Sequence, residues 1–287
     1  KKIKQQNIQN KKLLNQVIEK KITPKEFKKK ANKRFSFWQL ANKSFNIRQS
    51  DTSCKHNCLY CYMISIDQRF GRDPKVIDME DIMPTNSKNV DKIWRKADTK
   101  NVYFFPSSHD IFEENADDYV KVAKKIIDAG HEIVYITKPW FNTIKKISTN
   151  LNNKKYKEHI VFFMTITSND NKLLKKFEPN ASKYEERLKC LKYLHKNNFL
   201  TSVIIEPFLS EPTTLIDAVY PYVSEIIVVG EMNYTQSFID NLDIKTVKYI
   251  EKLYDPKNMR KIFDKNNKKD KVIWKKGFFN MILKEYK

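Results

Sequence analysis

The sequence is poor in cysteine, in glycine and in long apolar segments. Only four of its 287 residues are cysteines, and only four are glycines. A chain of this length with so few cysteines and no visible signal peptide is not a small secreted scaffold held by disulfides. No apolar run approaches the roughly 18 residues that a transmembrane helix needs. We therefore expect a soluble cytoplasmic protein without a membrane partner, and its 40% of hydrophobic residues can form a proper core.

Acidic residues are scarce as well, because 55 lysines and arginines face only 34 aspartates and glutamates, a formal net charge of +21. Residues 1–42 carry 13 basic and 2 acidic side chains, and residues 255–287 carry 11 and 4, so the middle of the chain holds a net charge of only +3. Two basic ends favour a polyanionic partner such as nucleic acid. Solvated, lysine-rich helices are the alternative interpretation.

Three of the four cysteines lie close together. Cys54, Cys58 and Cys61 form a C-x3-C-x2-C pattern, and iron–sulfur clusters are held by cysteine thiolates at such short spacings. Three thiolates on one loop can bind three irons of a 4Fe–4S cluster and leave the fourth iron without a protein ligand. An open metal position is typical of a catalytic site rather than a structural one.

The alternative for this loop is a zinc site formed by the three cysteines with His56 or the distant His109. Zinc sites usually show two separated ligand pairs, however, and no second CxxC and no HxxxH occurs in the chain. The fourth cysteine, Cys190, falls in the middle of a predicted helix near its apolar face. A packed core residue is the simpler interpretation there.

Local patterns predict an alternation of strands and helices. Thr23-Pro24-Lys25-Glu26 predicts a helix start with a capping box, so residues 1–42 should form two short basic helices. Strands are expected at 44–48, 102–106, 132–137, 160–165, 201–206 and 225–229. Helices are expected at 62–70, 90–95, 116–129, 140–151, 182–196 (capped by Ser182), 214–223 and 238–253.

Apolar strands that alternate with helices indicate a parallel sheet covered by helices. We therefore expect an α/β fold with six β/α units in residues 43–254. A basic helical N-terminal extension (1–42) and a basic helical C-terminal tail (255–287) should flank it.

Polar side chains follow the predicted strands. In parallel β/α barrels the working groups lie on the loops after the carboxyl ends of the strands. For Thr165 and Thr167, a role as ordinary strand residues is the alternative. For Glu206 and Glu231, a role as structural caps is the alternative. Besides the cysteine loop, this rule selects, in strand order, Ser107, Ser108, His109, Asp110, Lys138, Thr165, Thr167, Glu206, Glu231 and Asn233.

The cysteine spacing, with Tyr60 directly before the last cysteine, resembles the signature of the radical SAM superfamily. The remaining motifs resemble its spore photoproduct lyase-like branch and related phage-encoded radical SAM proteins of unknown function. The matching pieces lie in order within about residues 44–234. They are Phe105–Phe112, Ile136–Lys138, Thr165–Thr167, Glu178-Pro179, Glu186-Arg187, Ile205–Pro207 and Val229–Glu231.

This resemblance implies an open (β/α)6 partial TIM-type barrel with a 4Fe–4S cluster on the three cysteines. It implies that S-adenosylmethionine (SAM) chelates the open iron through its amino and carboxylate groups. An electron from the cluster would then cleave SAM to methionine and a 5′-deoxyadenosyl radical that abstracts hydrogen from a substrate. A reductant such as flavodoxin or ferredoxin would supply the electron.

The resemblance also implies roles at the SAM site. Ser107 or Ser108 would contact the SAM amino group, because the glycine-rich loop that many relatives use is absent. Lys138 and either Thr165 or Thr167 would hold the SAM carboxylate, which needs a cation and hydrogen-bond donors. Lys138 as a surface lysine is the alternative.

Further residues are selected with less definite roles. Tyr60 belongs to the cluster loop, and His109 and Asp110 would touch the adenine or ribose of SAM. Glu206 and Glu231 would bind substrate or SAM.

One departure concerns the substrate. Spore photoproduct lyase keeps a hydrogen-donating cysteine beside the second-strand serine, but Phe105-Pro106-Ser107-Ser108 occupies that place here. We therefore do not expect repair of the spore photoproduct itself. The favoured substrate is nucleic acid or another macromolecule. A peptide- or protein-modifying radical SAM enzyme is one alternative, and a non-catalytic cysteine–metal nucleic-acid-binding protein is another.

Overall fold

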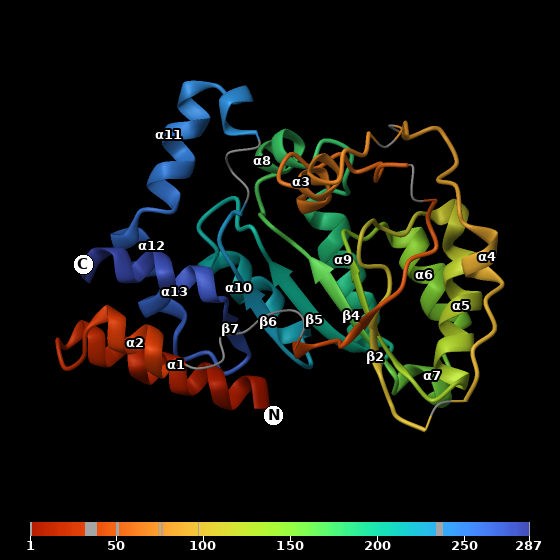
Figure 1. Ribbon diagram of the computed structural model, residues 1–287, viewed down its shortest axis with the longest axis horizontal. Coiled ribbons are helices and arrows are strands. Elements are labelled where there is room, and N and C mark those ends of the chain that lie inside the picture. Colours follow the sequence, from red (N-terminus) through yellow and green to blue (C-terminus); the bar gives the residue numbers. More distant parts are fainter. Residues whose placement is uncertain are drawn as a thin grey trace.

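The computed structural model describes residues 2–31, 39–49, 52–73, 75, 77–96, 98–233 and 238–286. A parallel sheet with its strands in sequential order runs through the molecule (Figure 1). Its strands are β1 (Lys43–Ser44), β2 (Val102–Phe104), β3 (Glu132–Thr137), β4 (Ile160–Thr165), β5 (Leu200–Ile205), β6 (Ile227–Val229) and β7 (Val272–Trp274). Parallel neighbours need a crossover between every pair of strands, which is the alternation that the sequence predicts.

Helices form these crossovers and extend both ends. The α-helices are α1 (Lys2–Ile18), α2 (Pro24–Lys30), α3 (Tyr62–Arg69), α4 (Ser87–Val90), α5 (Ala116–Asp128), α6 (Phe141–Asn150), α7 (Lys154–Lys157), α8 (Asn171–Phe177), α9 (Tyr184–Lys196), α10 (Thr213–Val219), α11 (Ile244–Leu253), α12 (Pro256–Asn266) and α13 (Lys276–Ile282). The 3₁₀ turns are η2 (Glu113–Asn115), η3 (Tyr220–Tyr222), η5 (Ile239–Asn241) and η6 (Leu283–Tyr286). No helix in the described ranges is long and apolar enough to cross a membrane.

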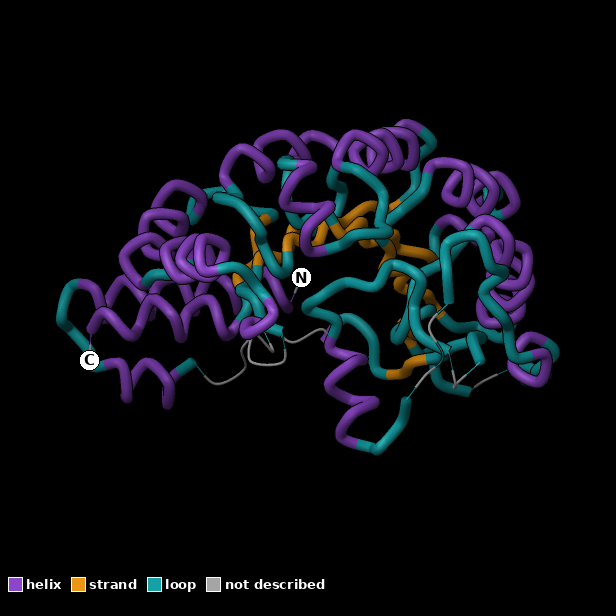
Figure 2. Tube along the Cα trace, turned by 90° about the horizontal axis from the view of Figure 1, so that it is seen from above, coloured by secondary structure: helices purple, strands orange, loops and turns teal. Residues whose placement is uncertain are grey.

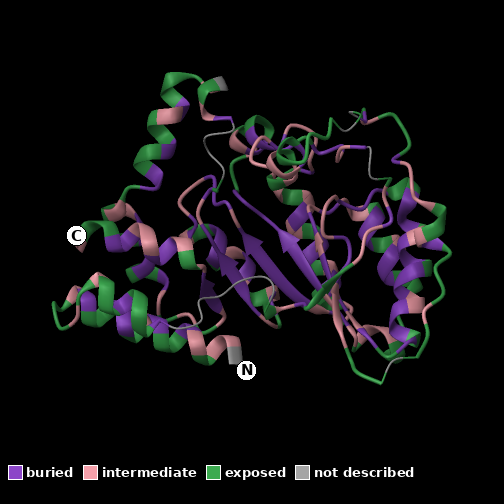
Figure 3. Ribbon diagram, viewed as in Figure 1, coloured by how far each residue is buried: buried purple, intermediate pink, exposed green. Residues whose placement is uncertain are grey.

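The sheet is curved and open, with helices on its outer side (Figure 2). Side chains alternate between its two faces. On β4, Phe162 and Met164 pack into the large core under the outer helices, whereas Val161 and Phe163 face a smaller apolar cluster on the inner side. Strands β3 to β7 are therefore buried along most of their length, whereas both residues of β1 are exposed. Other exposed residues concentrate on the outer helices and loops (Figure 3). This open parallel barrel is the predicted α/β fold.

The C-terminal segment corrects one expectation. Residues 255–287 were expected to be purely helical, but Val272-Ile273-Trp274 form β7, which pairs in parallel with β6. The sheet therefore has seven strands rather than six β/α units. Three apolar residues between lysine-rich stretches are too short for a periodic pattern to emerge.

The N-terminal segment packs against this added strand. The capping box at Thr23 and Glu26 forms as predicted and begins α2. Asn7 on α1 is buried against β7, where its Nδ2 donates to Val272 O at 2.8 Å and its Oδ1 accepts from Trp274 N at 3.2 Å. The two basic ends of the chain thus lie side by side (Figure 1). Residues 32–38 of the expected extension lie outside the described residues.

Some local predictions were wrong. Strand β1 has only two residues, and Arg48, expected within it, makes an isolated antiparallel bridge with Thr85. The helix expected at 90–95 is the single turn α4, which begins earlier because Asn86 caps it. Ser182 does not cap α9, whose N-cap is Lys183, and the Ser182 hydroxyl is buried without a hydrogen-bond partner.

Two further helix boundaries differ from prediction. The helix expected from residue 238 begins at Ile244, because Asp243 provides its N-cap. Residues 234–237 of the preceding loop lie outside the described residues. Helix α8, absent from the expectation, is capped by Asp170, whose side chain accepts from Lys172 N and Leu173 N.

Candidate functional site

A layer of mostly polar residues lies at the carboxyl ends of the strands, on the inner face of the sheet. Inner-facing apolar side chains occupy every second residue of the strands. The next position in the same alternation is Lys138 after β3, Thr165 at the end of β4, Glu206 after β5, Gly230 after β6 and Lys275 after β7. Lys138, Thr165 and Glu206 are among the residues predicted from the sequence. Lys275 was missed because β7 was missed.

The cysteine loop lies at the same end of the sheet and leads into α3. It consists of two tight turns, in which Asn57 N donates to Cys54 O at 3.2 Å and Cys61 N to Cys58 O at 3.0 Å. Asn57 has φ +48°, a left-handed conformation that asparagine tolerates better than most residues. Cys58 is buried, and Cys54 and Cys61 are half-buried.

Lys55 anchors the outer side of this loop. Its side chain is only 3% exposed, and its Nζ donates to Asp81 O at 2.6 Å and to Glu114 Oε1 at 2.7 Å. Lys55 is therefore a buried structural contact.

Asp110 anchors the inner side of the loop. Its Oδ2 accepts from His56 Nε2 at 3.0 Å and from Lys138 N at 2.7 Å. Its Oδ1 accepts from Ile111 N at 2.8 Å and from the Thr137 hydroxyl. Burial alone would raise the pKa of Asp110, but His56 and the hydrogen bonds hold it below its ordinary value. Asp110 therefore faces the protein and joins the loop to the end of β3.

Glu178 anchors the last part of the loop in a similar way. This fully buried carboxylate accepts from the Tyr60 hydroxyl, from Thr167 Oγ1 at 2.7 Å and from the Arg187 guanidinium. Arg187 also donates to Thr165 O at 3.2 Å. Burial raises the pKa of Glu178, but Arg187 and Lys138 outweigh burial and hold it below the ordinary value. The loop is thereby tied to the end of β4.

Lys138 stands between these two carboxylates. Its Nζ lies 5.5 Å from the centre of the Tyr60 ring, within the range of a cation–π contact. Burial tends to lower the pKa of the ammonium, but Cys58, Glu178 and Asp110 act more strongly and raise it. Lys138 is therefore a fixed positive charge beside the cysteine loop.

The thiols fit a metal cluster by their chemistry. Burial raises the pKa of Cys54 to about 12 and also raises that of Cys58, so without a bound cation both are neutral thiols at neutral pH. A coordinated metal deprotonates such thiols. In the part of the chain that the structure describes, no three His, Cys, Asp or Glu side chains converge on a single metal ion. In a 4Fe–4S cluster each thiolate would bind a different iron, so the three thiols would not have to converge on one metal position.

Asn46 organises the serines after β2. Its Oδ1 accepts from Ser107 N at 2.8 Å and from Ser108 N at 3.1 Å, and its Nδ2 donates to Ser107 Oγ at 2.9 Å. The Tyr62 hydroxyl donates to Ser107 O. The serines are thus held next to the first turn of α3.

His109 is tied to the core rather than to the cysteine loop. Its Nδ1 lies 3.2 Å from Ser108 Oγ, and its Nε2 contacts the hydroxyl of Tyr119, a buried residue of α5. Burial and the charge of Arg48 lower the pKa of His109 to about 3, so the ring is neutral.

Glu206 belongs to a second polar group over β5, β6 and β7. Its Oε1 lies 2.5 Å from Lys275 Nζ and accepts from Asn233 Nδ2 at 3.1 Å. The pair crosses over Gly230, where an added Cβ would lie 2.9 Å from Glu206 Cδ and 3.0 Å from Lys275 Cδ. Burial raises the pKa of Glu206 despite Lys275. Only a glycine directly after β6 leaves room for this ion pair.

Glu231 lies against α13. An added Cβ on Gly277 would fall 1.3 Å from Glu231 Oε1, and Glu231 Oε2 is buried without a hydrogen-bond partner. Burial raises the pKa of this carboxyl. The carboxyl group of Glu231 therefore occupies the space left by the missing side chain of Gly277.

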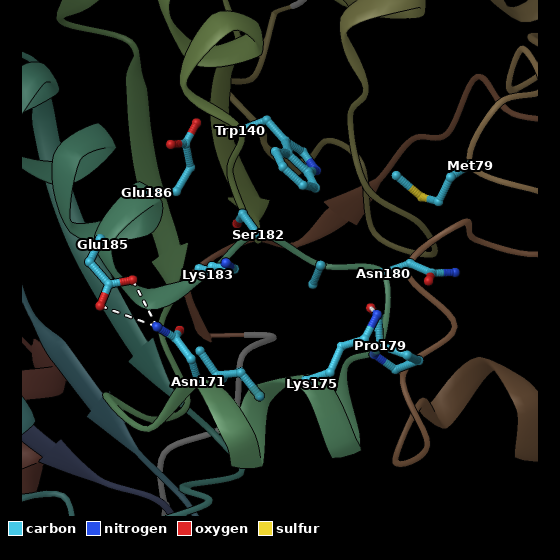
Figure 4. Close-up of a pocket in the computed structure, with 12 residues that line it drawn as sticks. Met79, Trp140, Asn171, Lys175, Pro179, Asn180, Ser182, Lys183, Glu185 and Glu186 are labelled. Carbon is cyan, nitrogen blue, oxygen red and sulfur yellow. Dashed lines mark hydrogen bonds between the residues drawn. The ribbon is translucent and has the colours of Figure 1, made fainter.

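A pocket of about 540 Å³ lies between α8, the start of α9 and Trp140 (Figure 4). None of the residues predicted for the site lines it. Asn180, on its wall, accepts from His56 Nδ1 at 3.2 Å and donates to Lys55 O at 3.0 Å. The wall of this pocket is thus the segment that wraps the cysteine loop.

The residues that sequence reasoning missed are those that hold the site together. Asn46, Lys55 and Arg187 carry no recognisable spacing, because their partners lie far away in the chain. Glu178 and Arg187 occur in the motif pieces of the family resemblance, which was the available signal, but nothing in the sequence showed that they pair.

Comparisons with known proteins identify the family of the chain. Residues 52–209 match the family model described as the Radical SAM superfamily. A spore photoproduct lyase variant has a TM-score of 0.53 at 13% identity, with 84% of this chain and 78% of that one covered. No curated protein sequence matches this chain.

Two further solved structures carry bound molecules. A spore photoproduct lyase variant with SAM and a dinucleoside spore photoproduct has a TM-score of 0.48 at 15% identity, with 77% of this chain and 63% of that one covered. SuiB of Streptococcus suis bound to SAM has a TM-score of 0.49 at 14% identity, with 88% and 55% covered. The chain thus spans less than two thirds of the length of both.

Proposed function

Because this chain belongs to the radical SAM superfamily of enzymes, we propose that it cleaves SAM at a 4Fe–4S cluster and acts on nucleic acid. The cluster ligands in this proposal are Cys54, Cys58 and Cys61. The observation that carries it is the cysteine loop itself. The loop stands at the carboxyl ends of the strands, and two buried carboxylates tie it to β3 and β4.

The residues around the loop fit the two groups. When bound, the cluster and SAM supply a low-potential electron and a 5′-deoxyadenosyl radical. Lys138 provides the fixed cation for the SAM carboxylate, and Thr165 stands at the neighbouring inner position of β4. We favour Thr165 over Thr167, because the Thr167 hydroxyl already donates to Glu178.

The remaining contacts to SAM follow from the loop after β2. Ser107 and Ser108 are the candidates for its amino group, because Asn46 fixes both near the start of α3. Glu206 with Lys275 would face the substrate on the other half of the mouth. The electron would come from a one-electron donor such as flavodoxin or ferredoxin.

Nucleic acid is the favoured substrate because the fold places the two basic ends of the chain next to each other. Asn7 joins α1 to β7, and Lys11 Nζ donates to Asn267 O at 2.7 Å. We call the exposed lysines of both segments the basic end. They are Lys12, Lys20, Lys21, Lys25, Lys28, Lys29, Lys30, Lys257, Lys261, Lys265, Lys268, Lys276 and Lys284. Such a concentration of lysines suits a phosphate backbone.

The test is to incubate reduced, reconstituted protein anaerobically with SAM and with single-stranded DNA, double-stranded DNA, RNA or peptides. We expect a nucleic acid to accelerate release of 5′-deoxyadenosine. Acceleration by peptides alone would replace nucleic acid by the protein-modifying alternative. Stoichiometric zinc without iron in anaerobically purified protein would favour the non-catalytic alternative.

A further inference from the structure

A single oxygen atom connects the cysteine loop to the lysine proposed for SAM. Asp110 Oδ2 accepts from His56 Nε2 at 3.0 Å and from the backbone N–H of Lys138 at 2.7 Å. His56 stands between Cys54 and Cys58, and Lys138 follows β3. These contacts span 54 residues on one side and 28 on the other. Asp110 therefore links the cluster loop to the end of β3 through one carboxylate oxygen.

We propose that Asp110 is a positioning residue that fixes the distance between the cluster and Lys138. The inference rests on the proposed function, in which one SAM molecule must reach the open iron and the Lys138 ammonium at once. Groups that act together on a small ligand must be held within about 0.5 Å of the productive geometry. A shared hydrogen-bond acceptor at the midpoint gives that constraint.

The carboxylate is the chemical group that this position needs. Four donors point at Asp110, two at each oxygen, and only an ionised carboxylate accepts on both oxygens. An asparagine would present an NH₂ group to one of these pairs, so two donors would lose their acceptor. The Asp110→Asn change therefore removes one of the two pairs of hydrogen bonds while keeping the size of the side chain, and His56→Phe removes the contact with the cluster loop whichever way the amide turns.

The other anchors of the loop provide a matched control. The Lys55–Glu114 pair also holds the cluster loop, but Glu114 contacts Lys55 and Met83 N rather than Lys138. Glu114→Gln should therefore weaken the loop without changing where Lys138 stands. A purely structural role of Asp110 would give the same result for both variants.

The experiment measures iron content and SAM affinity of reconstituted wild type, Asp110→Asn, Glu114→Gln, Lys138→Met and the Asp110→Asn/Lys138→Met double variant. Asp110→Asn should keep its iron but bind SAM about tenfold or more weakly, the usual effect of losing an outer contact of a metal site. The SAM-induced change in the electron paramagnetic resonance spectrum of the reduced cluster should shrink in parallel. Glu114→Gln should retain wild-type SAM affinity.

The double variant gives the decisive readout. If Asp110 acts through Lys138, the double variant should bind SAM no more weakly than Lys138→Met alone. Independent, additive losses would overturn the inference, as would a Glu114→Gln loss as large as that of Asp110→Asn. If Asp110→Asn does not fold, His56→Phe removes the same link from the other side and takes its place in the cycle. Failure of wild type to bind iron or SAM would instead contradict the proposed function.

Discussion

Ionisable side chains around the cysteine loop occur in pairs, namely Lys55 with Glu114, His56 with Asp110 and Arg187 with Glu178. Lys138 stands near two of these acids and remains positively charged. Removal of one partner from a buried pair leaves an uncompensated charge, whereas a complete pair is tolerated. At the scale of single residues, the stability of the folded chain should therefore be sensitive to changes that leave one partner alone.

Replacement of Lys138 tests the assignment of the SAM carboxylate. Lys138→Met keeps the length of the side chain but removes its charge, and SAM binding should weaken by about 1.5–3 kcal/mol, the scale of a hydrogen bond to a charged group. Iron content should not change, because Lys138 is not a cluster ligand in this account. Calorimetric titration with SAM measures the effect, and unaltered affinity would assign the carboxylate to a different residue.

Replacement of Arg187 tests the buried pair. Arg187→Met leaves the Glu178 carboxylate without its main cation, so unfolding should become easier by about 3–5 kcal/mol at neutral pH. In wild type the pKa of Glu178 is depressed, so the stability it contributes is present above the ordinary pKa and lost as pH falls through the lower folded value.

In the Arg187→Met variant, the contribution of Glu178 to stability should depend on pH in the opposite direction. Without Arg187, burial should raise the pKa of Glu178, and the carboxyl should be protonated more easily in the folded state than in the unfolded state. The stability deficit should therefore be largest at pH 7 and shrink as pH falls toward about 4.3, the ordinary value for glutamate. Urea unfolding at several pH values measures it, and a deficit that grows toward acid pH would contradict the pairing.

At the scale of elements, the last strand of the sheet depends on a helix from the other end of the chain. The edge strand β7 offers free backbone groups, and Asn7 of α1 satisfies Val272 O and Trp274 N with its side-chain amide. Uncovered edges are a risk for strand-to-strand aggregation. Helix α1 therefore covers the edge strand β7 of the open barrel.

Asn7→Ala should remove this cover. Two buried hydrogen bonds are lost, and their unsatisfied backbone partners should cost about 2–4 kcal/mol in the free energy of unfolding. Asn15→Ala, an exposed change on the same helix, provides the control, because the helix propensity changes equally in both. Equal stability of the two variants would show that α1 does not protect β7.

The same scale shows what the sequence could predict. The bounds of β3 and β4 were predicted correctly because four consecutive apolar residues in β3 and five in β4 leave a clear pattern. Strand β7 has only three residues, and β1 has two exposed ones, so neither has a periodicity to detect. Short strands are set by their neighbours in the sheet.

The same limit applies to the site. Lys138 and Glu206 could be selected because they directly follow apolar strands, and the structure places both at the inner mouth. Asp110 was selected by the same rule, but its hydrogen bond to Lys138 N could not be predicted, and Lys275 was not selected at all, because both contacts form only through tertiary packing. The local sequence shows which residues follow a strand, but it does not show which side chains from distant parts of the chain will contact them.

At the scale of the whole molecule, the fold brings together two segments that carry most of the net charge. If the basic end binds a phosphate backbone, nucleic-acid binding should fall steeply with salt, because each phosphate contact releases counterions. Replacement of Lys28, Lys29 and Lys30 by Gln should weaken binding to all sequences alike and make the salt slope shallower. Fluorescence anisotropy at several salt concentrations measures the slope.

A matched triple variant separates location from total charge. Lys154, Lys155 and Lys157 lie on α7, on the side of the molecule away from α1 and α2 (Figure 1). Their replacement by Gln changes the net charge equally but should leave the slope nearly unchanged. Equal effects of the two triples, or no binding at low salt, would remove the basic end as a docking surface and favour a peptide substrate.

The most direct test of the account is release of 5′-deoxyadenosine from SAM by the reduced, reconstituted protein. Wild type and Cys190→Ala should bind about four irons per chain and form 5′-deoxyadenosine, because Cys190 is buried in α9 away from the loop. Cys58→Ala should form none. Product formation in Cys58→Ala at the wild-type rate, or none from iron-loaded wild type, would contradict the central claim that the three-cysteine loop holds the SAM-cleaving cluster.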